Sequence, residues 1–118
     1  MWIATDFGFF SVVQKDDEDF LTVRARVRDD LDALRLRCSG LGPTIDTPLA
    51  DYGFRATVSH QDFGAALASI GSAINYHNFK DAVAARQGYE RASCYGEVWS
   101  ALMRLTRLNP VRRKTAAR

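Results

Sequence analysis

The sequence predicts an α+β fold, a two-layer sandwich in which an antiparallel-rich, four-stranded sheet carries helices on one face. Two segments, residues 21–28 and 52–59, alternate apolar and polar side chains with a period of two, as half-buried strands do. Residues 60–74 instead repeat apolar side chains with the period of a helix. The elements are expected in the order β-β-β-α-β-α-α, and the helices should cover the apolar face of the sheet.

The first half of the chain supplies three strands and a helix. "MWIAT" and "GFFSVVQK" are rich in aromatic and β-branched residues and are expected to form a hairpin, with Asp6 and Gly8 at the turn. The alternating strand "LTVRARVR" follows, with Val23, Ala25 and Val27 on its apolar side. Asp29 or Asp30 then begins the helix "DLDALRLRC".

Helical patterns dominate the second half. Ser59 and Asp62 form a variant capping box before an apolar stripe of Phe63, Ala66, Leu67, Ile70 and Ile74. "NYHN" interrupts this helix, and Asn78 begins a helical pattern that extends to Leu108, with a break at Gln87–Gly88. The last part of the pattern has six apolar side chains at helical spacing, among which we expect Trp99 to be largely buried: Ala92, Tyr95, Val98, Trp99, Leu102 and Leu105.

Length and charge predict the domain organisation. The chain has 118 residues, which favours one domain, and we expect this domain to span residues 1–108. Residues 109–118 are expected to be a disordered basic tail, since six basic residues and no acidic one lie between Arg104 and Arg118. An acidic segment, "DDED", occupies residues 16–19.

Composition also bears on location and cofactors. No apolar run is long enough to cross a membrane, and we expect no membrane partner. Cys38 and Cys94 are far apart in the chain, with no Cys-x-x-Cys and no metal-ligand spacing of histidines. The sequence therefore predicts a cytoplasmic protein with no metal site and no cofactor.

Four arginines form the principal candidate site. Arg24, Arg26 and Arg28 alternate with the apolar side of their strand, and Arg55 has the corresponding position on the later strand. If helices cover the apolar side, all four share the open face, where guanidinium groups bind phosphates and neighbouring rings stack on bases. Phe9 or Phe10 is a candidate ring. We therefore interpret the chain as a non-catalytic binding module for single-stranded nucleic acid or another phosphate-rich ligand.

Other interpretations stay open. The arginines also suit an ordinary solvated sheet face, neutralised by "DDED". The chain also suits a protein-interaction module, including a homodimer, that uses a strand edge or the helix of Trp99. Four side chains near the helix break form a secondary anion site or a small catalytic corner: Tyr76, His77, Lys80 and Arg86. No established catalytic motif is present, so a binding role is favoured over an enzymatic one.

Several strings also resemble a family of small bacterial proteins for which no activity is established. They are "GFFSVVQK", "LTVRARVRDDLDALR", "DYGFRA" and "YHNFKDAVAARQGYERASCYGEVW", and the resemblance covers the chain from Met1 to about Leu105. It implies a free-standing cytosolic protein and assigns no catalytic or binding residue. The segment after Leu108 departs from the family pattern.

Overall fold

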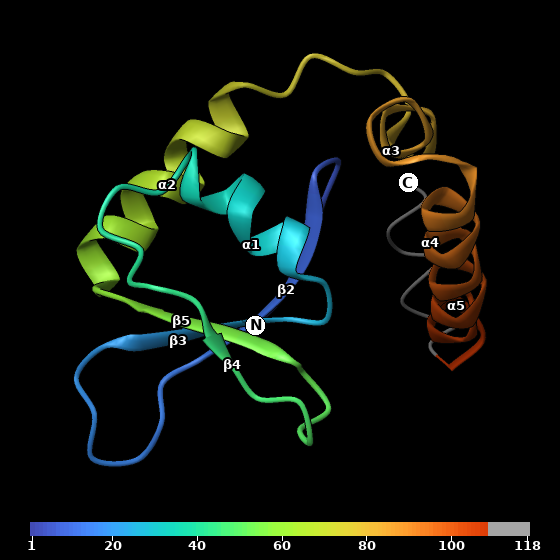
Figure 1. Ribbon diagram of the computed structural model, residues 1–118. Coiled ribbons are helices and arrows are strands. Elements are labelled where there is room, and N and C mark those ends of the chain that lie inside the picture. The colour runs from blue at the N-terminus through green and yellow to red at the C-terminus, as the bar shows by residue number, and fades with distance from the viewer. Residues whose placement is uncertain (109–118) are drawn as a thin grey trace. The chain divides into compact units, whose positions relative to one another are not determined.

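The computed structural model describes residues 1–108 and has two compact units, Met1–His77 and Asn78–Arg118 (Figure 1). The first is an α+β unit, and the described part of the second is helical. The predicted tail, residues 109–118, lies outside the described residues. The prediction of a single domain over 1–108 stays a prediction.

The α+β unit contains a five-stranded antiparallel sheet in the order β1-β2-β3-β5-β4. Its strands are β1 (Trp2–Thr5), β2 (Gly8–Val13), β3 (Leu21–Ala25), β4 (Ile45–Asp46) and β5 (Phe54–Val58). The α+β class and the antiparallel sheet are confirmed, but the predicted count of four strands is wrong. The additional strand, β4, has only two residues, which is too short to show an alternating pattern.

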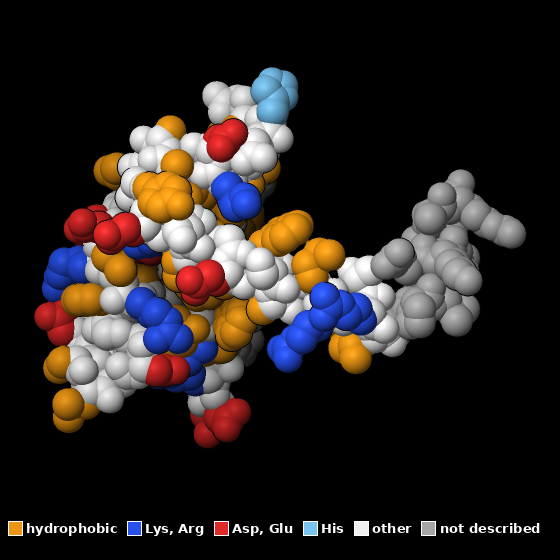
Figure 2. Space-filling model, turned by 90° about the vertical axis from the view of Figure 1, so that its right-hand side faces the viewer, with side chains coloured by type: hydrophobic (Ala, Val, Ile, Leu, Met, Phe, Trp, Pro, Cys, Tyr) orange, Lys and Arg blue, Asp and Glu red, His pale blue; other side chains and the backbone are white. Residues whose placement is uncertain are grey.

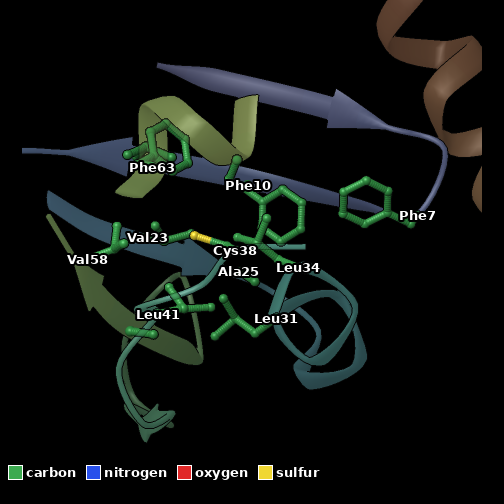
Figure 3. Packing of buried hydrophobic residues seen from close by; sticks show 13 residues of the cluster. Phe7, Phe10, Val23, Ala25, Leu31, Leu34, Cys38, Leu41, Val58 and Phe63 are labelled. Atoms are coloured by element: carbon green, nitrogen blue, oxygen red, sulfur yellow. The ribbon is translucent and has the colours of Figure 1, made fainter. Parts of the chain in front are cut away.

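Two helices, α1 (Arg28–Arg35) and α2 (His60–Ser72), lie on one side of the sheet (Figure 1). Their apolar stripes pack on the apolar side of β2, β3 and β5, as Figure 3 shows. Because burying both stripes together removes apolar surface from water, the helices and the sheet stabilise each other. The most deeply buried side chains of this core include Phe10, Val23, Ala25, Leu31, Leu34 and Ala56.

The hairpin turn explains how α1 approaches β2. Thr5 Oγ1 donates to the Gly8 carbonyl at 2.8 Å and accepts from the Gly8 amide at 3.0 Å, so one hydroxyl closes the turn. Asp30, which is buried, accepts a hydrogen bond from the Phe9 amide through Oδ2 at 2.9 Å. A Cβ atom at Gly8 would lie 2.9 Å from Asp30 Cβ. Glycine is therefore required where the helix meets the strand.

Two expected core positions are wrong because their elements end early. β3 ends at Ala25, and Val27 becomes the N-cap of α1, where it is 41% exposed. Helix α2 ends at Ser72, so Ile74 lies beyond it and is exposed. The predicted cap of α2 is confirmed in part, since Ser59 Oγ accepts from the Asp62 amide at 3.1 Å.

The helical unit contains α3 (Phe79–Gln87), α4 (Tyr89–Leu102) and α5 (Arg104–Leu108). Gly88 separates α3 from α4, which confirms the predicted break, and its φ of 99° is a conformation that favours glycine. The rings of Phe79 and Tyr95 stack with their centroids 5.8 Å apart. The expected burial of Trp99 is wrong: its side chain is 60% exposed, and the Lys80 ammonium lies 5.7 Å from the centroid of its ring.

Candidate functional site

A single row of side chains crosses all five strands on the side of the sheet away from α1 and α2. Directly opposed residues in antiparallel strands point to the same face, and Val23 and Ala56, an opposed pair, point into the core. The next opposed positions therefore point the other way. From edge to edge they are Trp2, Ser11, Arg24, Arg55 and Ile45. We call this row, together with Phe9, the open sheet face, although Ser11 within it is buried and accepts a hydrogen bond from Arg24.

Arg24 lies at the centre of the open sheet face. Its Nη2 donates to Ser11 Oγ at 2.6 Å, and its guanidinium lies 4.8 Å from the centroid of the Tyr52 ring. Tyr52 is buried. Arg24 Nε is also buried and meets no acceptor in the described part of the chain. The Arg24 side chain thus contacts both Ser11 and Tyr52, and within residues 1–108 no carboxylate forms an ion pair with its guanidinium group.

Arg26 follows the end of β3 and contacts the loop between β4 and β5. Its Nη1 donates to the Asp51 carbonyl at 2.9 Å, and its guanidinium lies 4.5 Å from the Tyr52 centroid. Two guanidinium groups therefore contact one ring, an arrangement that favours a fixed loop through cation–π attraction. Tyr52 precedes β5 in the sequence, and this position did not indicate that its ring would contact Arg24 and Arg26.

Arg55 is directly opposite Arg24 in the register. Its recorded side-chain bond is from Nε to Thr47 Oγ1 at 3.2 Å. Like charges directly opposite each other on neighbouring strands repel, and within the described residues neither arginine has an acidic partner. The expected neutralisation by "DDED" is not seen in residues 1–108, since no hydrogen bond or ion pair there joins a side chain of residues 16–19 to the four arginines.

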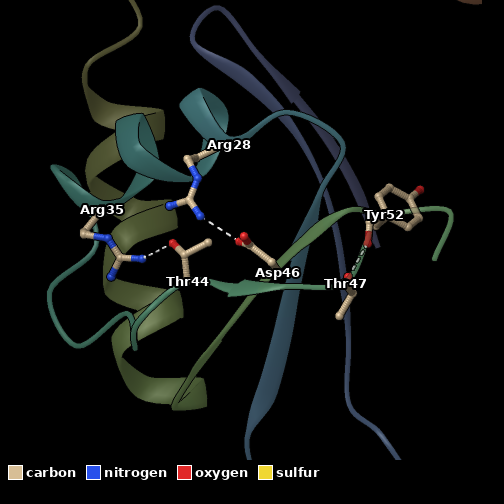
Figure 4. Close-up of polar contacts among 6 residues, drawn as sticks. All are labelled: Arg28, Arg35, Thr44, Asp46, Thr47 and Tyr52. Atoms are coloured by element: carbon tan, nitrogen blue, oxygen red, sulfur yellow. Dashed lines mark hydrogen bonds and ion pairs between the residues drawn. The ribbon is translucent and has the colours of Figure 1, made fainter. Parts of the chain in front are cut away.

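Arg28 does not join the other three arginines. It is the first residue of α1 and forms an ion pair with Asp46 at 2.7 Å (Figure 4). Its guanidinium also lies 5.3 Å from the ring of Phe54, which opposes the buried Ala25 and so belongs to the helix side of the sheet. The structure thus brings Arg24, Arg26 and Arg55 together and places Arg28 on the other side.

Aromatic side chains complete the open sheet face. Phe10 is buried in the core, and Phe9 points to the opposite side, which decides between the two candidate rings. Phe9 contacts Trp2 edge to face, with centroids 6.0 Å apart and planes at 70°. Trp2 itself is 75% exposed. Sequence reasoning missed Trp2, although its alternation with Ile3 was a usable signal.

The secondary candidate residues lie in two neighbouring segments of the chain. Tyr76 and His77 lie in the segment between α2 and α3, whereas Lys80 and Arg86 lie in α3. Lys80 faces the ring of Trp99.

Other chemistry on the described chain is limited. No group of three or more histidine, cysteine or acidic side chains that could hold a metal ion occurs in residues 1–108. Burial raises the pKa of the Cys38 thiol, and the nearby Asp62 carboxylate adds to this effect, so Cys38 is a poor nucleophile. Within the same residues, no helix is both long and apolar enough to cross a membrane.

Charges of both signs share the face visible in Figure 2, where basic, acidic and apolar side chains are intermixed. Local contacts, and not an excess of one charge on this face, therefore distinguish the candidate site. Searches for similarity found no matching protein-family model, no similar curated protein and no similar solved structure. The resemblance of the sequence to small bacterial proteins stays a prediction.

Proposed function

We propose that the protein is a non-catalytic binding module that holds a phosphate-rich ligand on the open sheet face. One observation carries the proposal: Arg24 and Arg55 oppose each other on neighbouring central strands, and no carboxylate neutralises either in the described chain. Two guanidinium groups at strand spacing repel each other unless an anion lies between them. Planar guanidinium donors match the oxygens of a phosphate.

Arg55 differs from Arg24 and Arg26 in which donor it commits to the protein, since its bond uses Nε and theirs use a terminal nitrogen. Its Nε donates to Thr47, and within residues 1–108 both terminal nitrogens stay available to contact a ligand. Arg24 spends one donor on Ser11 and Arg26 spends one on the Asp51 carbonyl. We therefore assign the main ligand contact to Arg55, with Arg24 and Arg26 providing positive potential. This function suits the cytoplasmic location that the sequence predicts.

The test is calorimetric titration of the protein with inorganic polyphosphate at low salt. Arg55→Ala should weaken binding about tenfold or more, because charge-assisted hydrogen bonds are lost. Arg28→Ala is the matched control: it removes the same charge from the helix side and should leave affinity within about twofold, as expected for a screened charge. Equal losses in the two variants would show that only net charge matters. No binding by the parent protein would refute the proposal.

A second function, self-association, is favoured by the exposed apolar side chains of the helical unit. Val98, Trp99, Leu102 and Leu105 are each more than half exposed. These side chains recur at helical spacing in the sequence, and exposed apolar surface is typical of protein contacts. If a second copy covers it, light scattering should give a dimer mass for the parent protein and a monomer mass for Leu102→Glu. A monomeric parent would exclude this role.

A further inference from the structure

We infer that the phosphate-rich ligand is single-stranded nucleic acid, with one base stacked on Trp2 and the phosphates of neighbouring nucleotides at Arg24 and Arg55. This inference rests on the proposed anion-binding function and adds the class of ligand. It depends on the row geometry of the open sheet face, on the exposure of Trp2, and on the width of the sheet.

The row places a ring and two charges on one line. Trp2, Ser11, Arg24 and Arg55 occupy successive strands in the same register. At about 4.8 Å per strand, Trp2 lies roughly 10 Å from Arg24 and roughly 14 Å from Arg55 at the backbone. The ring of Trp2 and the two guanidinium groups are therefore too far apart to contact the base and the phosphate of a single nucleotide. They match a base and phosphates that belong to different nucleotides of one strand.

Trp2 is suited to base stacking. It is 75% exposed, and the edge-to-face contact with Phe9 supports it from one side. Indole rings offer a large π-face, on which a base stacks without regard to its identity. An inorganic polyphosphate has no group that uses this ring, whereas an oligonucleotide engages the ring and the arginines together.

The width of the sheet disfavours duplex DNA. Five strands span about 19 Å across, but the major groove of B-form DNA is only about 12 Å wide. The row therefore does not enter a groove, and the paired bases of a duplex stay out of reach of Trp2. Unpaired bases, which are free to turn toward the sheet, reach it without this restriction.

The experiment uses the full chain and reads the fluorescence of Trp2. Trp99→Phe, a change at an exposed position, removes the only other tryptophan. In this background we expect a twelve-residue oligothymidylate to quench the remaining fluorescence, and polyphosphate or a duplex of matched charge to leave it nearly unchanged. Trp2→Ala should weaken oligothymidylate binding about tenfold and change polyphosphate binding less than twofold, whereas Trp2→Phe should restore part of the loss.

The outcomes separate this inference from the proposed function. If polyphosphate binds and depends on Arg55, but Trp2→Ala has no effect on oligothymidylate, the anion site stands and the nucleic-acid inference is wrong. Equal affinity for duplex and single strand would also overturn it, as would binding to anionic vesicles but not to oligothymidylate. The basic segment after Arg104 is the same in every variant, so it does not contribute to the differences.

Discussion

At the scale of single residues, the four arginines that the sequence grouped together have different roles. The alternation of residues 21–28 correctly predicted that Arg24 and Arg55 share a face. It did not predict that β3 stops at Ala25, after which the period of two no longer applies and Arg28 turns to the helix side. Nor did it predict Tyr52, whose contacts with Arg24 and Arg26 arise between segments distant in sequence.

Arg24 should therefore matter for stability as well as binding. Arg24→Ala removes the bond to Ser11 and the contact with Tyr52, and we expect a loss of about 1.5–3 kcal/mol. Arg28→Ala breaks an ion pair whose side chains are 49% and 59% exposed, and should cost no more than about 1 kcal/mol. Urea unfolding of both variants measures the difference. A smaller loss for Arg24→Ala than for Arg28→Ala would contradict the assigned contacts.

The two cysteines should differ in reactivity. Cys38 is buried with a raised thiol pKa, whereas Cys94 is exposed. A thiol reagent at pH 8 should modify Cys94 quickly and Cys38 only as the protein unfolds. The pKa of the Cys38 thiol is higher in the folded protein than in the unfolded chain. The contribution of this thiol to the free energy of unfolding is therefore present at pH values below its pKa in the unfolded chain. It is lost as the pH rises through its pKa in the folded protein. Rapid reaction of Cys38 in a Cys94→Ser variant would contradict its burial.

At the scale of elements, local patterns predicted the hairpin, α1, α2 and the break at Gly88, because periodicity and caps are local signals. β4 was not predictable because its two residues, Ile45 and Asp46, are recruited by pairing with β5. The stripe of Trp99 predicted a buried face from its spacing alone. A helical period shows that a face is apolar, but it does not show what covers it.

Alanine substitutions at two glycines, Gly8 and Gly64, test how closely the hairpin packs against α1. Gly8→Ala places a methyl group 2.8 Å from Phe10 Cζ and 2.9 Å from Asp30 Cβ, and should destabilise the protein by about 2 kcal/mol or more. Gly64→Ala, in α2, meets no atom within 4 Å and should stabilise it by about 0.5–1 kcal/mol. Thermal unfolding distinguishes the two. Similar melting temperatures would show that α1 does not approach β2 so closely.

At the scale of the whole molecule, the first unit contains the complete sandwich. Every buried residue of its core cluster lies between Phe7 and Ala66, so we expect residues 1–77 to fold without the helical unit. A protein of residues 1–77 should unfold cooperatively in urea and show the far-ultraviolet circular dichroism of an α+β fold. Loss of the cooperative transition would instead support one domain over residues 1–108.

The central claim is that the open sheet face binds single-stranded nucleic acid, and amide chemical-shift mapping with oligothymidylate tests it most directly. In ¹⁵N-labelled full-length protein, we expect the changes to concentrate on the indole of Trp2 and the amides of Phe9, Ser11, Arg24 and Arg55, and to leave α1 and α2 nearly unaffected. Changes concentrated on α1 or on residues 89–108, or no changes at low salt, would contradict the account.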